Sequence, residues 1–259
     1  MIDSHIHSTF STDSRMPAEA AIIEAIKKGL DGVVFTEHLD YDYPGYESSF
    51  QIDYDAYFSE MERLRKKYGG RIRIYAGLEA GIQPHVAERT ANTLAGQQFD
   101  FIIASIHIIK GMDPYSNQTL YNGREKHDVY SEYLMLIDEM LNYYHVFDAL
   151  GHFDYITRYA PYEDVSIRYE DYSSIFDSIF NKLISKGNIM EINTASYREK
   201  PGRPSPAFDT NILIRYREMG GKTVSLGSDA HETQYLNWKF SEFERYISAA
   251  GLNVKSRFR

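Results

Sequence analysis

The fold class is decided by residues 2–38, IDSHIHSTFSTDSRMPAEAAIIEAIKKGLDGVVFTEH, in which two short apolar segments flank a longer helical pattern. We interpret residues 2–7 and 32–36 as strands and residues 17–28 as a helix. Pro17 suits the first helical position, and Gly29 suits the position just after a helix end. A strand, a helix and a second strand in this order predict a βαβ unit with parallel strands.

The same alternation continues along the rest of the chain. Further strands are predicted at 72–78, 101–107, 149–153, 189–193 and 223–228, and further helices at 54–68, 85–95, 129–144, 169–186, 210–219 and 241–250. No Gly-rich dinucleotide turn is present, so the seven strands favour a closed or nearly closed barrel over a doubly wound sheet. We therefore expect an α/β protein with a (β/α)7 TIM-like barrel. No linker or repeat divides the chain, and 259 residues suit one such barrel, so residues 1–259 are predicted to form a single domain.

Composition excludes several classes of protein. The chain has no cysteine, which excludes disulfides, a thiolate nucleophile and thiolate metal ligands. The longest apolar stretch, residues 101–109, is far shorter than the ~20 residues of a membrane span. The first residues have no signal-peptide pattern, so a cytoplasmic location is expected. The net charge of −9 argues against nucleic-acid and membrane partners but allows a small anionic substrate at a locally positive site.

Histidines and acidic residues gather at the C-terminal ends of the predicted strands. The carboxyl ends of parallel barrel strands converge on one mouth, where barrel enzymes build their active sites. We therefore expect one site that brings together His5, His7, His38, His107, His152 and His231 with Glu37, Glu79, Glu191 and Asp229.

Such a cluster predicts a metal centre. The His5-Ile6-His7 pair directs both imidazoles to one side of a strand. Alone, such a pair is at least as consistent with a chance or solvated pair as with a metal site, and a single histidine is more often a hydrogen-bonded core residue. The whole set, however, favours metal binding. Imidazole and carboxylate ligands without sulfur suit Zn, Fe or Mn. Because one zinc takes about four ligands, this set predicts two to three divalent ions, and two neighbouring metals suit phosphoryl transfer.

The motifs resemble those of the polymerase and histidinol phosphatase (PHP) superfamily, and within it the stand-alone histidinol-phosphate phosphatases. The resemblance spans nearly the whole chain and rests on His5-Ile6-His7-Ser8, Asp13-Ser14, Thr36-Glu37-His38, Glu79, Ser105-Ile106-His107, Gly151-His152-Phe153-Asp154 and Gly227-Ser228-Asp229-Ala230-His231. It implies a distorted seven-stranded barrel with a trinuclear metal centre.

The resemblance also implies how the ligands are shared. The first metal would take His5, His7, Glu79 and Asp229, the second Glu79, His107 and His152, and the third Asp13, His38 and His231. Many superfamily members have histidine where Asp13 stands, and the phosphatase branch resembles this chain in having aspartate. A plain turn aspartate before Pro17 is the alternative interpretation of Asp13.

Arginines are expected to bind the phosphate, because a guanidinium group can contact two phosphate oxygens at once. The resemblance suggests Arg158 and Arg198, with Arg203 and Arg124 on nearby loops as substitutes. Glu37 and Glu191 are candidates for orienting a metal ligand, for contact with the substrate amine or merely for a hydrogen bond. Ser8 and Asn193 are similar candidates for the orienting role, and Ser8 is also a candidate for substrate contact. By contrast, His85, His127 and His145 are interpreted as surface residues.

We therefore predict a metal-dependent phosphomonoesterase that hydrolyses L-histidinol phosphate in histidine biosynthesis, by attack of a metal-bridging hydroxide on phosphorus. Asp229 and His231 are candidates for assisting the leaving group. The long loops at 39–53, 110–126 and 196–208 all follow strands and predict a covered pocket for a small molecule. Alternatives are another PHP phosphoesterase, such as a protein-tyrosine phosphatase or a nucleotide or oligonucleotide hydrolase, and a non-catalytic metal-binding module. The sequence does not predict an oligomeric state.

Overall fold

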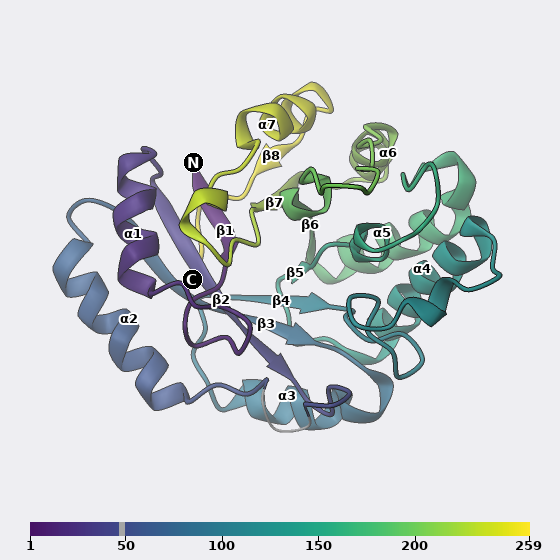
Figure 1. Ribbon diagram of the computed structural model, residues 1–259. Helices are drawn as coiled ribbons and strands as arrows, with labels where there is room; N and C mark the ends of the chain where they lie inside the picture. Colours follow the sequence, from purple (N-terminus) through teal and green to yellow (C-terminus); the bar gives the residue numbers. More distant parts are fainter. Residues whose placement is uncertain (47–49) are drawn as a thin grey trace.

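The computed structural model describes residues 1–46 and 50–259, and its centre is a single curled parallel sheet (Figure 1). Eight strands follow one another across the sheet in chain order. They are β1 (Ile2–Ile6), β2 (Gly32–Asp40), β3 (Arg73–Gly81), β4 (Phe101–Ser105), β5 (Ala149–Leu150), β6 (Ile189–Asn193), β7 (Thr223–Gly227) and β8 (Asn253–Val254). The α/β class and the parallel sheet predicted from the sequence are confirmed.

Seven α-helices of the described chain lie around the outside of the curled sheet (Figure 1). They are α1 (Ala18–Lys27), α2 (Tyr54–Tyr68), α3 (Ala87–Ala95), α4 (Lys126–Tyr143), α5 (Ser173–Lys186), α6 (Asn211–Glu218) and α7 (Phe240–Ala249). The helix α2 shows how sequence specifies them. Asp53 accepts a hydrogen bond from the backbone N–H of Ala56 at its start, and Tyr57, Met61 and Leu64 form its buried face.

The sheet differs from the expected barrel in strand number and in closure. The predicted seven strands correspond to β1–β7, and β8 pairs with the first half of β7. A strand of two residues has too few positions to show an alternating pattern, so the sequence did not reveal it. The edge strand β1 meets the chain just after β7 through a parallel bridge between Ile6 and Ala230. The sheet therefore curls until β1 approaches the C-terminal end of β7.

Strand boundaries matter for the site. The strands β2 and β3 extend past the predicted ends, so His38 and Glu79 lie within strands and face each other in register. By contrast, β5 stops at Leu150, before the predicted end. A side chain at Gly151 would bring its Cβ within 2.2 Å of Ser105 Oγ, so the chain turns here with no room for a larger residue.

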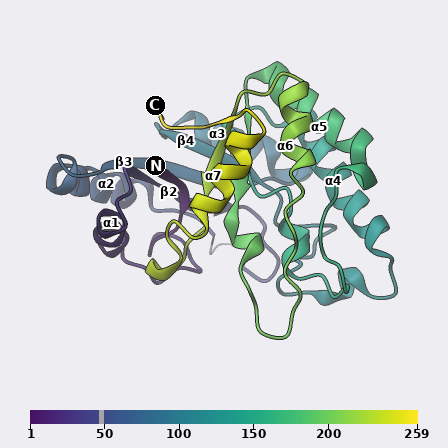
Figure 2. The same cartoon turned by 90° about the horizontal axis from the view of Figure 1, so that it is seen from above.

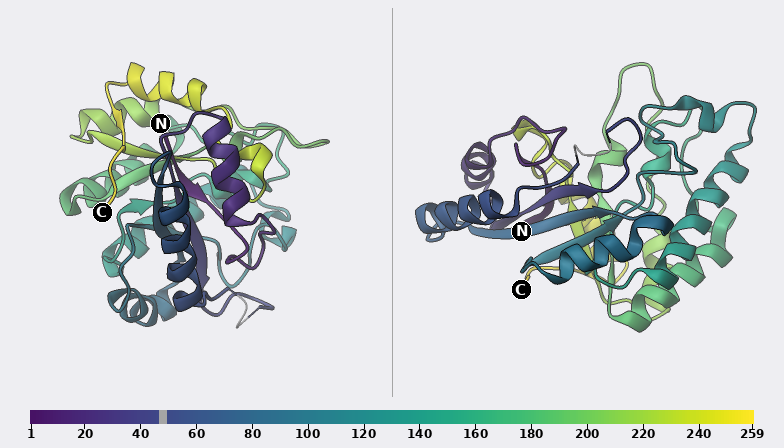
Figure 3. Two further views of the ribbon diagram at one scale, coloured as in Figure 1. Left: turned by 90° about the vertical axis from the view of Figure 1, so that its left-hand side faces the viewer. Right: turned by 90° about the horizontal axis from the view of Figure 1, so that it is seen from below.

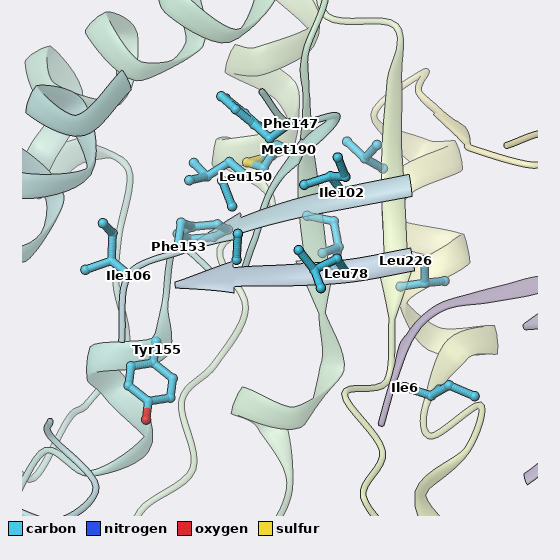
Figure 4. Close-up of a cluster of buried hydrophobic side chains, with 14 of the residues drawn as sticks. Ile6, Leu78, Ile102, Ile106, Phe147, Leu150, Phe153, Tyr155, Met190 and Leu226 are labelled. Carbon is cyan, nitrogen blue, oxygen red and sulfur yellow. The ribbon is translucent and has the colours of Figure 1, made fainter. Parts of the chain in front are cut away.

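Apolar side chains fill the space between sheet and helices and lead up to the site. Leu78, Ile102 and Leu226 are buried in this cluster (Figure 4). Tyr155 lies at its margin, with its hydroxyl oxygen pointing away from the apolar side chains (Figure 4). The predicted loops are present, although residues 47–49 of the first fall outside the described residues. The segment between β6 and α6 projects from the body of the molecule (Figures 2 and 3).

None of the helices in residues 1–46 and 50–259 is both long and apolar enough to cross a membrane.

Candidate metal centre

The first strand delivers two facing imidazoles. Alternation along β1 buries Ile6 in the core and places His5 and His7 on the other side, with their Nε2 atoms 3.0 Å apart. Asp229, which follows β7, places Oδ1 3.3 Å from His7 Nε2 and 3.7 Å from His5 Nε2. Its backbone N–H donates to the carbonyl of His5 over 2.7 Å, so the approach of β1 to the end of β7 also positions this carboxylate.

Glu79 is the centre of the cluster. Its Oε2 lies 3.2 Å from His5 Nε2, 3.4 Å from His7 Nε2 and 3.2 Å from His38 Nδ1. Its Oε1 lies 3.2 Å from His107 Nε2 and 2.8 Å from His152 Nε2. One buried carboxylate is thus shared by five imidazoles that come from four strands or strand ends.

A third group extends the cluster toward solvent. Asp13 Oδ2 lies 3.1 Å from His231 Nε2 and 3.4 Å from His38 Nε2. The rings of His38 and His231 both stack on His7, with centroids 4.3 Å away in each case. Asp13 therefore belongs to the cluster and is more than a turn residue.

The donor set fits divalent metal ions. Burial, together with the positive charges of His231 and His38, lowers the pKa of His7 to about 3. Burial also opposes the charged form of His107, but Asp40 and Glu79 raise its pKa to about 10. The buried atoms His38 Nδ1 and Asp40 Oδ2 have no hydrogen-bond partner in the described chain.

Three groups bring ligand atoms within 4.8 Å of one another, the spacing that a shared ion requires. They are His7 with His38 and His231, His5 with His7 and Asp229, and His38 with Glu79 and His107. The nitrogen and oxygen donors are those that Zn, Fe and Mn accept.

A layer of buried carboxylates orients these imidazoles from behind. His5 Nδ1 donates to Glu191 over 2.7 Å, and His107 Nδ1 donates to Asp40 over 2.8 Å. Such partners fix the ring orientation and the free nitrogen of a ligand histidine. Asp40 was not predicted, although its place two residues after His38 on the same strand face was an available signal.

Three predicted substrate contacts, Ser8, Glu37 and Glu191, lie in this same layer. Glu37 accepts hydrogen bonds from the hydroxyls of Ser8 and Ser11, and Ser11 Oγ lies 3.0 Å from His7 Nδ1. The side chains of Ser8, Glu37 and Glu191 are fully buried, and none of them lines the pocket described below. Their geometry favours the orienting role over contact with a substrate.

Glycines make room for the orienting layer. A Cβ at Gly81 would lie 1.7 Å from Asp40 Oδ1, and one at Gly227 would lie 2.5 Å from Glu191 Oε1. The missing side chains thus allow these carboxylates to reach the histidines.

The metal-ligand cluster forms the floor of a pocket of about 520 Å³. Its cationic wall consists of Arg158, Arg198 and Lys200. By contrast, Arg124 pairs with Glu132 over 2.7 Å, and neither Arg124 nor Arg203 lines this pocket.

The two predicted arginines are held differently. Arg158 donates to Asp229 over 2.8 Å, to Asn193 over 3.0 Å and to Ser196 over 3.0 Å. Arg198 donates from Nη2 to the carbonyl of Ser228, but its buried Nε has no partner in the described residues. Arg198 lines the pocket, while its Nε lies buried beneath the pocket surface.

Lys200 was missed by the sequence analysis, because one lysine in a loop carries no pattern. Its Nζ lies 4.6 Å from the centre of the Tyr159 ring. Burial and the charges of Arg158, Arg203 and Arg198 lower the pKa of Lys200 to about 8.

The predicted surface histidines are exposed, with 58% of the His85 side chain and 65% of the His127 side chain accessible.

Comparison with known proteins relates the whole chain to one family. Residues 3–195 match the model of the PHP domain. The chain is 34% identical to a histidinol-phosphatase of Lactococcus lactis, over 99% of this chain and 94% of that protein. It is 33% identical to a probable histidinol-phosphatase of Clostridium acetobutylicum, over 100% of this chain and 92% of that protein.

A solved structure agrees with this relationship. The crystal structure of histidinol phosphate phosphatase from Lactococcus lactis, in complex with zinc, L-histidinol and phosphate, superposes with a TM-score of 0.90 at 31% identity. The match covers 99% of this chain and 96% of that one. With its imidazole and carboxylate cluster at the mouth of a curled parallel sheet, the chain belongs to the PHP family, and the two relatives named above are described as a histidinol-phosphatase and a probable histidinol-phosphatase.

Proposed function

We propose that this chain is a phosphomonoesterase that hydrolyses L-histidinol phosphate to L-histidinol and inorganic phosphate, a step of histidine biosynthesis. The observation that carries the proposal is the sharing of Glu79 by five imidazoles beside a wall of two arginines and a lysine. The full-length similarity to histidinol-phosphatases supports the choice of substrate.

Two to three divalent ions, Zn, Fe or Mn, would be bound by the cluster. We assign His5, His7, Glu79 and Asp229 to the first ion, Glu79, His107 and His152 to the second, and Asp13, His38 and His231 to the third. When bound, such ions lower the pKa of water and neutralise charge that develops on phosphoryl oxygens.

The cationic wall would hold the phosphoryl group on the side opposite the metal ions. Arg198 and Lys200 both line the pocket, and each adds a positive charge. Arg158 has three of its five donors engaged, which leaves two for a phosphate oxygen. Fixed positive groups of this kind stabilise the charge of the phosphoryl transition state without reorganisation.

A proton must reach the oxygen of the leaving alcohol. Asp229 and His231 both line the pocket and are the candidates for this proton transfer. Asp229 has a fixed position through Arg158, whereas the side chain of His231 is 28% exposed.

Residues 1–259 are proposed to act as one domain, since the sheet runs from Ile2 to Val254. A cytoplasmic location without nucleic-acid or membrane partners stays a prediction.

The test is phosphate release by the purified, metal-loaded protein from L-histidinol phosphate, phosphotyrosine, p-nitrophenyl phosphate and a phosphodiester. The proposal expects kcat/KM to be highest for L-histidinol phosphate, with the diester hydrolysed least. Preference for phosphotyrosine or for the diester would assign the chain to another PHP phosphoesterase. No hydrolysis of any ester by protein with verified metal content would support a non-catalytic module.

A further inference from the structure

The pocket also contains a buried carboxylate, that of Asp113. This residue lies in the loop between β4 and α4, lines the pocket and is 2% exposed. Its Oδ1 accepts hydrogen bonds from the Tyr155 hydroxyl over 3.0 Å and from the Tyr115 backbone N–H over 2.9 Å. Its Oδ2 accepts one from the Tyr43 hydroxyl.

No positive side chain neutralises this carboxylate. Within residues 1–46 and 50–259, no lysine, arginine or histidine forms an ion pair with Asp113, and its side-chain partners are neutral hydroxyls. A carboxylate has about four acceptor positions, so these three donors leave one of them open. Because a buried charge is costly without a partner, the open position suits a cation that enters with the ligand.

The surroundings of Asp113 also favour an organic cation. The rings of Tyr43, Phe50, Tyr115, Tyr155 and Tyr159 line the same pocket as Asp113. Aromatic faces attract ammonium and imidazolium groups. The Tyr43 and Phe50 rings lie 4.4 Å apart, and the Tyr115 and Tyr159 rings 5.5 Å apart.

Tyr155 connects Asp113 to the metal-ligand cluster. Its ring lies 5.1 Å from that of His152 and 5.5 Å from that of His107, and its hydroxyl reaches Asp113. The Arg158 guanidinium lies 5.2 Å from the centre of the Tyr155 ring. The Tyr155 side chain therefore contacts both the Arg158 guanidinium and the Asp113 carboxylate.

We propose that Asp113 is the specificity-determining residue for the organic half of the substrate, and that it binds a positively charged ammonium or imidazolium group. The phosphate end binds at the arginines and the metal ligands, and the cationic end binds at Asp113 and the tyrosines. This inference rests on the proposed function and adds the residue that distinguishes an amine-bearing phosphate ester from a neutral one.

The variant Asp113→Asn tests the proposal, because it removes the charge and keeps the shape. Its kcat/KM for L-histidinol phosphate is expected to fall by roughly 30-fold or more, mainly through KM, as when one partner of a buried charge pair is lost. Its kcat/KM for p-nitrophenyl phosphate, which has no cation, is expected to stay within about 3-fold of wild type. Asp113→Glu keeps the charge and should recover part of the loss.

Asp128→Asn is the matched control, because this acidic side chain is 72% exposed on α4. It should leave both substrates unaffected. An equal loss on both substrates in a folded Asp113→Asn protein would show a structural role, and no loss on either would show no role. Each of these two results would overturn the proposal.

Inhibition of p-nitrophenyl phosphate hydrolysis makes the test independent of the proposed substrate and of the variant's folding. In the wild-type protein, L-histidinol should inhibit at least about 10-fold better than the neutral 3-phenylpropanol; equal inhibition would overturn the proposal. N-acetyl-L-histidinol and 2-amino-1-propanol then identify whether imidazole or amine is bound. If L-histidinol inhibits but L-histidinol phosphate is not hydrolysed, the proposed function fails while the Asp113 site stands.

Discussion

Arg158 and Asp229 form a buried ion pair that joins the cationic wall of the pocket to the cluster of imidazoles and carboxylates. Arg158 Nη1 donates to Asp229 Oδ2 over 2.8 Å, and Asp229 Oδ1 lies 3.3 Å from His7 Nε2. The two side chains are only 8% and 6% exposed. Arg158 therefore has a positioning role toward Asp229 in addition to any contact with phosphate.

Replacing Arg158 by methionine should impair both the positioning of Asp229 and the binding of the phosphoryl group. We expect kcat to fall by roughly 10²–10³-fold, because a fixed positive group at the phosphoryl site is lost. Bound metal should also decrease, since Asp229 loses the partner that orients it. Steady-state kinetics and elemental analysis of the same sample check this. Arg124→Met, which breaks a pair outside the pocket, is the control, and wild-type kcat in Arg158→Met would contradict the assignment.

Replacing Arg198 by glutamine should separate phosphate binding from metal binding. The Arg198 side chain contacts none of the proposed metal-binding side chains, and its Nε has no partner in the described structure. We expect kcat/KM to fall by about 10²-fold or more, with metal content equal to wild type. Competitive inhibition by inorganic phosphate should weaken in parallel. Loss of metal together with activity would show that Arg198 acts through the cluster instead.

The lowered pKa of Lys200 predicts a pH dependence. Its pKa of about 8 lies below the ordinary lysine value, so Lys200 is cationic at pH 7 and loses its proton as the pH rises through 8. The positive charge at the phosphate wall decreases in the same range, and kcat/KM should fall above pH 8 because this ratio reports groups of the free enzyme.

Lys200→Arg provides the comparison, because arginine keeps its proton throughout that range. Its profile should lack the decline near pH 8, whereas Lys200→Met should be less active at pH 7 and also lack the decline. An unchanged decline in Lys200→Met would assign the titration to another group.

Gly81→Ala tests the carboxylate layer behind the histidines. The added Cβ would lie 1.7 Å from Asp40 Oδ1, so Asp40 must move away from His107. Metal affinity should fall by roughly 10–100-fold, as for other losses of an orienting partner, and the melting temperature should drop. Gly96→Ala is the control, because its nearest atom would be Thr93 O at 3.6 Å. Equal metal affinity in both variants would contradict the role of Asp40.

Local patterns explain why most of the fold was predictable. The α2 segment was predicted at its observed bounds, because a capping aspartate and a regular buried face specify it. The end of β2 was misplaced, because polar residues such as Glu37 and His38 interrupt the apolar run while the strand continues to Asp40. The pairing of Ile6 with Ala230 joins β1 to the segment after β7, more than 200 residues later, and has no local signal.

In the site, too, residues in local patterns were predictable and residues placed by tertiary contacts were not. His5, Glu79 and Asp229 were predictable, because ligands at strand ends in a parallel sheet must converge. Asp113 and Lys200 were not, since each is one polar residue in a long loop whose path depends on tertiary contacts. The burial of Glu191 was equally hidden, because its place behind His5 depends on the missing side chain of Gly227.

The measurement that tests the central claim most directly is phosphate release from L-histidinol phosphate during metal titration of chelator-treated protein. The account predicts no release without metal and release that rises with bound Zn or Mn until two to three ions per chain are present. In a Glu79→Ala protein that still folds, metal should restore no release, because the shared carboxylate is gone. Release that is independent of metal, or full restoration in Glu79→Ala, would contradict the account.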